Sequence, residues 1–207
     1  MSGEPQIHRA EADDFAWHAA GNPLPDAADV AIVGGGIVGC SAAYFLARSG
    51  VSVALFEKGR IAGEQSGRNW GWVRQQGRSP VELPLMMQSL RLWKELPTQL
   101  GEDIGFHQGG SLYLAEDAKQ LAALEEWLAV AREHSLATRI VTGSELKAVF
   151  AAGDRWAGAL YTASDSRAEP SRAVPAIARG AVHAGASILS RTAVRGIETA
   201  PGACPRS

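Results

Sequence analysis

A chain of 207 residues is long enough to bury a hydrophobic core, and its length predicts one or two domains. A hydrophobic content of 46% and a charged content of 20% are those of an ordinary globular protein. The formal net charge of −2 gives no reason to expect a nucleic acid or an anionic membrane as partner.

The sequence lacks the signals of a membrane or secreted protein. No hydrophobic run is long enough to span a bilayer, and residues 1–25 are too acidic and too polar for a secretory signal. Two cysteines, Cys40 and Cys204, do not make a disulfide framework, and the five histidines show no metal-ligand spacing. We therefore expect a cytoplasmic protein with no transmembrane segment and no metal site.

The first predicted elements form a strand, helix and strand after an extended leader. Residues 30–33 are an apolar, β-branched run, typical of a parallel strand buried on both faces. A helix is predicted over residues 37–49, ending at Gly50, and a second strand over residues 51–56. We expect the two strands to pair in parallel, with the first at the centre of the sheet and the helix across one face.

A glycine-rich turn joins the first strand to the helix. Gly34, Gly36 and Gly39 fit G-x-G-x-x-G, in which the glycines allow a tight turn, close approach of a pyrophosphate and helix packing. The N-terminus of the helix favours a phosphate anion. Glu57 follows the second strand, where a carboxylate can accept both ribose hydroxyls of an adenosine. The stretch therefore predicts a dinucleotide site.

Residues 59–77 form a long polar segment punctuated by glycines, and loops of this length are uncommon unless functional or disordered. Trp70 and Trp72 argue against disorder. Beyond this segment the sequence predicts helices over 81–96, 116–134, 142–150 and 169–184, and strands over 109–115, 158–162 and 187–194.

Residues 30–58 resemble the N-terminal signature of FAD-binding oxidoreductases. Three further stretches, residues 66–71, 84–93 and 158–186, narrow the resemblance to the D-amino acid oxidase family, which includes glycine oxidase, sarcosine oxidase and D-amino acid dehydrogenase. The resemblance covers residues 28–198. It implies an α/β fold in which a Rossmann-like, FAD-binding parallel sheet carries an inserted, smaller α+β part of a substrate domain.

The resemblance also implies a role for each residue that matches the family's motifs. The pyrophosphate of FAD would be held by Gly34, Gly36, Ile37, Val38 and Gly39. Glu57 would bind the adenosine ribose, Lys58 would lie beside the adenosine, and the backbone of Val194 would meet the adenine. Phosphates or the flavin ring would contact Ser66, Arg68, Asn69, Gly71 and Trp72. Arg74 would grip a substrate carboxylate bidentately; for Arg68 and Arg74 a solvated loop charge is the alternative. No catalytic residue is predicted.

The expected domain organisation has five parts. A leader spans residues 1–28, a first part of the FAD-binding domain residues 29–79, and a partial substrate domain residues 80–160. The chain returns to the FAD-binding domain over residues 161–198. Residues 199–207 form an aberrant tail, whose prolines and glycine do not continue a strand.

The resemblance implies hydride transfer to flavin from the C–N bond of a D-amino acid or N-methyl amino acid. Family members are considerably longer than this chain, so two alternatives stay open. The chain is either an inactive truncated fragment or an FAD-carrying subunit whose fold is completed by a second polypeptide. An NAD-dependent dehydrogenase is a further alternative, although a nicotinamide enzyme would not need the segment 66–72.

Overall fold

The computed structural model describes residues 24–198. Most of the predicted leader, all of the predicted tail 199–207 and Cys204 therefore lie outside the described residues. The chain divides into two compact units: residues 1–69 with 170–207, called here the first unit, and residues 70–169, the second unit. These boundaries differ from the expected ones at 79/80 and 160/161, because β3 (Trp72–Val73) pairs with β7 (Ser166–Arg167) inside the second unit.

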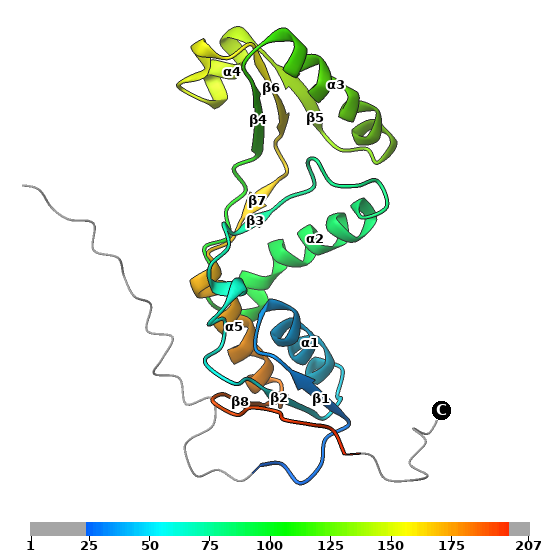
Figure 1. Ribbon diagram of the computed structural model, residues 1–207, viewed down its shortest axis with the longest axis vertical. Coiled ribbons are helices and arrows are strands. Elements are labelled where there is room, and N and C mark those ends of the chain that lie inside the picture. The colour runs from blue at the N-terminus through cyan, green and yellow to red at the C-terminus, as the bar shows by residue number, and fades with distance from the viewer. Residues whose placement is uncertain (1–23, 199–207) are drawn as a thin grey trace, which may run out of the picture. The chain divides into compact units, whose positions relative to one another are not determined.

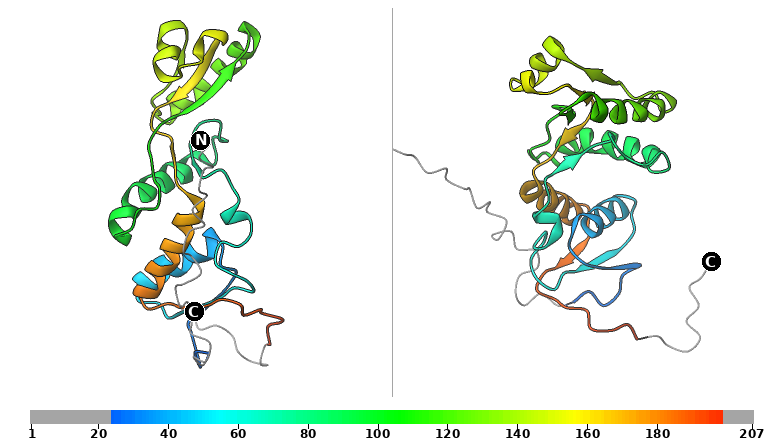
Figure 2. Two further views of the ribbon diagram at one scale, coloured as in Figure 1. Left: turned by 90° about the vertical axis from the view of Figure 1, so that its left-hand side faces the viewer. Right: turned by 45° about the horizontal axis from the view of Figure 1, so that its top comes forward.

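The first unit contains a parallel sheet with two helices on one of its faces (Figures 1 and 2). Its strands are β1 (Val30–Val33), β2 (Val53–Phe56) and β8 (Ser187–Leu189), in the order β1-β2-β8. Its helices are α1 (Ile37–Arg48) and α5 (Pro170–His183), and a short 3₁₀ turn, η1, spans Gln65–Gly67. The predicted parallel pairing of the first two strands is confirmed, with Val30 opposite Val53.

Small side chains make the core between the two helices. Ala43 and Ala47 of α1 are buried, as are Ala173, Ala176 and Ala181 of α5. Helices whose facing side chains are small can approach closely, and α1 and α5 pack against one another. This packing fixes the direction of α1, and so the direction in which its N-terminus points.

The predicted position and burial of the first strand are wrong. Among the described residues β2 is the central strand, and β1 lies at the edge of the sheet. Burial alternates along β1, where Ala31 is exposed and Val33 is 65% exposed. Because all four residues of β1 are apolar, the sequence pattern did not distinguish a strand covered on one face from one covered on both.

The second unit contains an antiparallel sheet of β4 (Ser111–Ala115), β6 (Gly158–Thr162) and β5 (Thr138–Val141), in the order β4-β6-β5. The short pair β3–β7 forms a separate ribbon. The helices of this unit are α2 (Leu83–Leu100), α3 (Ala118–Glu133) and α4 (Gly143–Val149), with a 3₁₀ turn at Gly153–Arg155. α3 packs along the three-stranded sheet (Figure 2).

Most predicted elements are confirmed to within a few residues. The last strand is shorter than predicted: β8 ends at Leu189, whereas the sequence predicted a strand to residue 194. Strands β3, β5 and β7 were not predicted. Between residues 24 and 198, no helix combines the length and apolar character needed to cross a membrane.

Candidate functional site

The turn between β1 and α1 is built around the predicted glycines. Gly34 has a φ of +110°, which favours glycine, and its N–H donates to the Phe56 carbonyl at 2.8 Å. A Cβ on Gly39 would lie 2.0 Å from the Gly34 carbonyl oxygen. Gly39 therefore allows α1 to begin directly against the turn, which is the packing role expected of the third glycine.

The N-terminus of α1 presents backbone N–H groups. The Ile37 N–H donates to the Ser66 Oγ at 2.9 Å, whereas the N–H groups of Gly36 and Val38 have no acceptor within residues 24–198. A Cβ on Gly36 would lie 3.0 Å from the same Ser66 Oγ. Unpaired N–H groups and the helix dipole together favour an anion such as a phosphate.

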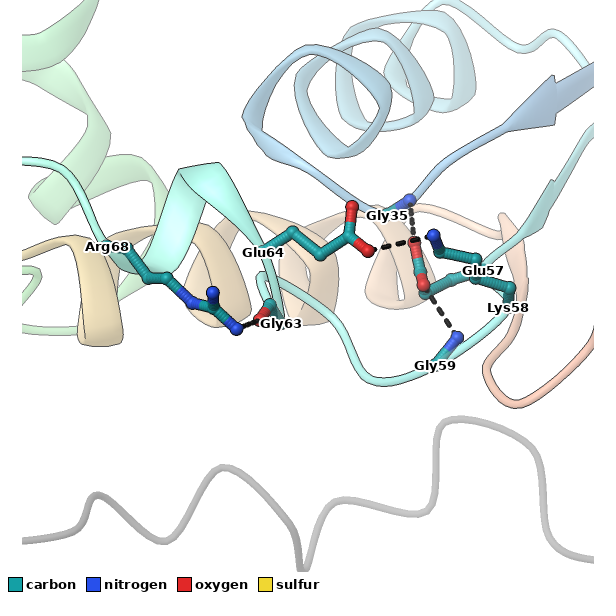
Figure 3. Close-up of polar contacts among 7 residues, drawn as sticks. All are labelled: Gly35, Glu57, Lys58, Gly59, Gly63, Glu64 and Arg68. Atoms are coloured by element: carbon teal, nitrogen blue, oxygen red, sulfur yellow. Dashed lines mark hydrogen bonds and ion pairs between the residues drawn. The ribbon is translucent and has the colours of Figure 1, made fainter.

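Glu57 stands beside the glycine turn at the carboxyl end of β2 (Figure 3). Its Oε2 accepts the Gly35 N–H at 2.7 Å, and its Oε1 accepts the Gly59 N–H at 2.7 Å. Each carboxylate oxygen has a second lone pair, so the half-buried side chain can still accept hydroxyl protons from a ligand. In open α/β sheets, ligands bind beyond this end of the strands.

Lys58 forms an ion pair with Glu64, 2.8 Å apart (Figure 3). The hydrogen bond between them, and then their opposite charges, raise the pKa of Lys58 and lower the pKa of Glu64. Both side chains are about two-thirds exposed, at 67% and 70%, so the pair contributes little to stability. Arg68 is exposed as well and donates to the Gly63 carbonyl at 3.3 Å.

Cys40 lies behind the glycine turn with no exposed surface, and its thiol donates to the Gly35 carbonyl at 3.4 Å. Burial, and then the negative charge of Glu57, raise the pKa of this thiol to about 12. Cys40 therefore stays protonated at neutral pH and serves packing.

The segment predicted to reach the flavin is divided between the two units. Ser66 and Asn69 belong to the first unit, where the Asn69 amide donates to the Ser66 carbonyl at 2.9 Å and so ties η1 together. Gly71 and Trp72 belong to the second unit, where the Gly71 carbonyl accepts the Ala168 N–H at 2.9 Å. Val194 follows β8 in the first unit and is 42% exposed.

Arg74 lies between two aromatic rings of the second unit. Its guanidinium carbon is 5.2 Å from the centroid of the Trp72 ring and 5.7 Å from that of Tyr113. One guanidinium nitrogen donates both to the Gln76 carbonyl and to the Tyr113 hydroxyl. Within residues 24–198 no carboxylate forms an ion pair with Arg74. A half-buried cation with donors to spare can bind an anionic ligand.

Tyr113 was not among the predicted site residues. It lies on β4, 39 residues after Arg74, and only the pairing of β4 with β6 defines its position. The alternating pattern of residues 109–115 predicted the strand, but it contained no signal for the contact with Arg74.

Comparison with known proteins identifies the family. Residues 29–206 match the family model DAO, described as "FAD dependent oxidoreductase". The chain belongs to this family. FAD is therefore the family's cofactor, and the match favours FAD over the nicotinamide alternative. The predicted α/β fold, in the form of a partial D-amino acid oxidase-like domain, is confirmed.

Individual relatives of the family agree with this assignment. The chain is 29% identical over 182 residues to the mitochondrial sarcosine dehydrogenase of Mus musculus, covering 84% of this chain and 20% of that protein. It is 30% identical over 190 residues to the glycine oxidase of Bacillus licheniformis, covering 84% of this chain and 48% of that protein. The solved structure of the L-amino acid deaminase from Proteus myxofaciens, in complex with anthranilate, superposes on this chain with a TM-score of 0.82 at 36% identity. The match covers 87% of this chain and 42% of the deaminase chain.

The chain thus spans less than half the length of these relatives. The described residues nevertheless fit the dinucleotide part of FAD, because the first unit offers unpaired N–H groups at the N-terminus of α1, Gly36 without a side chain among them and a carboxylate held by two backbone N–H groups.

Proposed function

We propose that the first unit binds the ADP part of FAD. The observation that best supports this proposal is the oriented Glu57 carboxylate beside the N–H groups at the N-terminus of α1. In this proposal, the pyrophosphate lies against the turn formed by Gly34, Gly36, Ile37, Val38 and Gly39. Glu57 accepts the adenosine ribose hydroxyls, Lys58 lies beside the adenosine, and the backbone of Val194 contacts the adenine.

The remaining predicted contacts concern the phosphates and the flavin. The Ser66 hydroxyl accepts the Ile37 N–H, so a bound phosphate would compete with this hydroxyl for that donor. Contacts with the phosphates or the flavin ring are likewise proposed for Arg68, Asn69, Gly71 and Trp72. FAD, when bound, supplies the redox chemistry by accepting a hydride, and the chain supplies orientation and electrostatics.

The proposed substrate is an amino acid whose C–N bond is oxidised. The three relatives are named for sarcosine, glycine and L-amino acids, which supports an amino acid substrate in general. D-amino acids and N-methyl amino acids are the first compounds to test. Arg74 is the proposed ligand of the substrate carboxylate, because its guanidinium has unused donors and no carboxylate partner in the described part of the chain.

A second candidate function is that of an FAD-carrying subunit completed by another polypeptide. The observation that favours it is the edge position of β1, where Val33 is 65% exposed. A strand edge with exposed apolar side chains can pair with another chain. In this case FAD binding would be retained, and turnover would require the partner.

One experiment separates these functions. Residues 1–207 are expressed, mixed with FAD and passed through a gel-filtration column, so that bound flavin and oligomeric state are measured together. Anaerobic addition of a D-amino acid or N-methyl amino acid then tests flavin reduction by loss of the visible absorbance. A flavin-bound monomer that is bleached supports the enzyme. Bound flavin without bleaching supports the subunit, and a chain that retains no flavin is an inactive fragment and contradicts both.

A further inference from the structure

Asp165 is a carboxylate with no exposed surface in the second unit. It lies in the turn between β6 and β7, where its N–H donates to the Thr162 carbonyl at 3.3 Å. Its Oδ1 accepts the Gln75 N–H at 2.8 Å and its Oδ2 accepts the Gln76 N–H at 3.1 Å, from a loop 90 residues earlier in the chain. Within residues 24–198 no cation forms an ion pair with it, so these hydrogen bonds offset the cost of its burial.

Further hydrogen bonds make Asp165 the meeting point of three segments. The Gln75 side-chain amide donates to the Ser164 hydroxyl at 3.0 Å and to the Asp165 Oδ1 at 3.4 Å. The Asp165 carbonyl accepts the Gly110 N–H at 2.9 Å, one residue before β4. The loop after β3, the β6–β7 turn and the start of β4 are thus tied to a single buried residue.

Arg74 directly precedes the two residues that Asp165 holds. Its guanidinium donates to the carbonyl of Gln76, whose N–H is bound by Asp165, and to the hydroxyl of Tyr113. Gly77 follows Gln76 in this loop with a φ of +68°, and a Cβ there would lie 2.9 Å from the Tyr113 ring. The orientation of the guanidinium therefore depends on the backbone conformation that the Asp165 carboxylate fixes.

We propose that Asp165 is a positioning residue for Arg74 and thereby sets the affinity of Arg74 for a carboxylate ligand. This role rests on the proposed binding of a substrate carboxylate by Arg74. A guanidinium that is held in place before the ligand arrives loses less conformational freedom on binding, so the fixed loop increases affinity. An exclusively structural Asp165 would affect the stability of the second unit and leave ligand affinity unchanged.

The test is a titration of the full chain with benzoate as the carboxylate probe. Binding is followed by NMR through the Nε–Hε signal of Arg74, assigned by its absence in Arg74→Lys. Asp165→Asn keeps the size of the side chain but places an NH₂ group where an oxygen accepted an N–H. Asp154→Asn is the matched control, because Asp154 belongs to the same unit and is exposed in its pair with Lys147.

We expect benzoate to shift the Arg74 signal saturably, with the same Kd, in the wild type and in Asp154→Asn. In Asp165→Asn the Kd should be at least about fivefold higher, and the Arg74 signal should already be displaced before benzoate is added. Equal affinity in Asp165→Asn would overturn the positioning role and leave the proposed role of Arg74 intact. A wild type whose Arg74 signal does not respond to benzoate would overturn both.

If Asp165→Asn does not fold, Asp165→Glu replaces it. Its longer side chain displaces the loop, so the same weakening is expected and an unchanged Kd overturns the positioning role.

Discussion

The carboxylate of Glu57 lies 2.7 Å from the backbone nitrogen of Gly35, although 22 residues separate the two in the chain. This bond joins the end of β2 to the glycine turn. The second carboxylate oxygen is held by the Gly59 N–H at the same distance. Glu57 is therefore oriented in advance, which lowers the conformational cost of binding a ribose.

Replacing Glu57 with Gln should weaken FAD binding about tenfold, which corresponds to about 1.4 kcal/mol. The substitution keeps the size of the side chain but removes its charge and replaces one accepting oxygen with an NH₂ group. Fluorescence titration of FAD measures the effect. Asp26→Asn is the control, because Asp26 belongs to the first unit, is exposed and forms no ion pair within residues 24–198. Equal losses in the two variants would show that Glu57 has no specific role.

Replacing Gly39 with Ala should destabilise the first unit by about 1–3 kcal/mol. The new methyl group would lie 2.0 Å from the Gly34 carbonyl oxygen, which is backbone and moves only if α1 shifts. Urea denaturation followed by circular dichroism measures the loss. Gly196→Ala is the control, because a Cβ on Gly196 meets no atom within 4 Å and should leave stability unchanged.

Replacing Ser66 with Ala should destabilise the FAD-free chain by about 1 kcal/mol, because the Ile37 N–H loses its acceptor. A bound phosphate can take over that N–H, so saturating FAD should reduce the difference between the variant and the wild type. Thermal unfolding with and without FAD measures both values. A deficit that is equally large with FAD would show that the phosphate does not reach Ile37.

Cys40 should resist alkylation in the folded chain. Its thiol is buried and its pKa is raised to about 12, so very little thiolate is present at pH 8. Iodoacetamide labelling in a Cys204→Ser background, analysed by mass spectrometry, should modify Cys40 only after urea is added. Rapid labelling of the folded chain would contradict its burial.

The same pKa shift predicts a pH dependence of stability. The thiol pKa is higher in the folded chain than its ordinary value of 9.0, so the protonated thiol contributes stability that is fully present below pH 9 and is lost as the pH rises toward 12. Between these values the wild type should lose more unfolding free energy than Cys40→Ala. Parallel losses would show that Cys40 ionises equally in both states.

The sequence was sufficient to predict the fold and the site where neighbouring residues alone determine the structure. The spacing of Gly34, Gly36, Gly39 and Glu57 predicted the turn, the helix and the adjacent carboxylate, since each depends on neighbours in one strand–helix–strand unit. It was insufficient where distant segments meet. β1 lies at the edge because β8 pairs with the other side of β2. β8 begins 157 residues after β1 begins (187 − 30), and no local pattern encodes that pairing.

The contacts of Arg74 and Asp165 were missed for the same reason. Asp165 appears in the sequence as one polar residue among Ser164 and Ser166, a composition typical of a solvated turn. Only the antiparallel pairing of β3 with β7 brings that turn to the loop after β3 and buries the carboxylate. The sequence pattern contained no signal for this burial.

The central claim, that the first unit binds the ADP part of FAD, is tested most directly by competition. The full chain is saturated with FAD, ADP or FMN is added, and the FAD that stays bound after gel filtration is quantified by liquid chromatography, which separates FAD from FMN. ADP should displace FAD because it carries the adenosine and pyrophosphate that Glu57 and the N-terminus of α1 are proposed to bind, and FMN, which lacks the adenosine, should not. Displacement by FMN and not by ADP would contradict the claim.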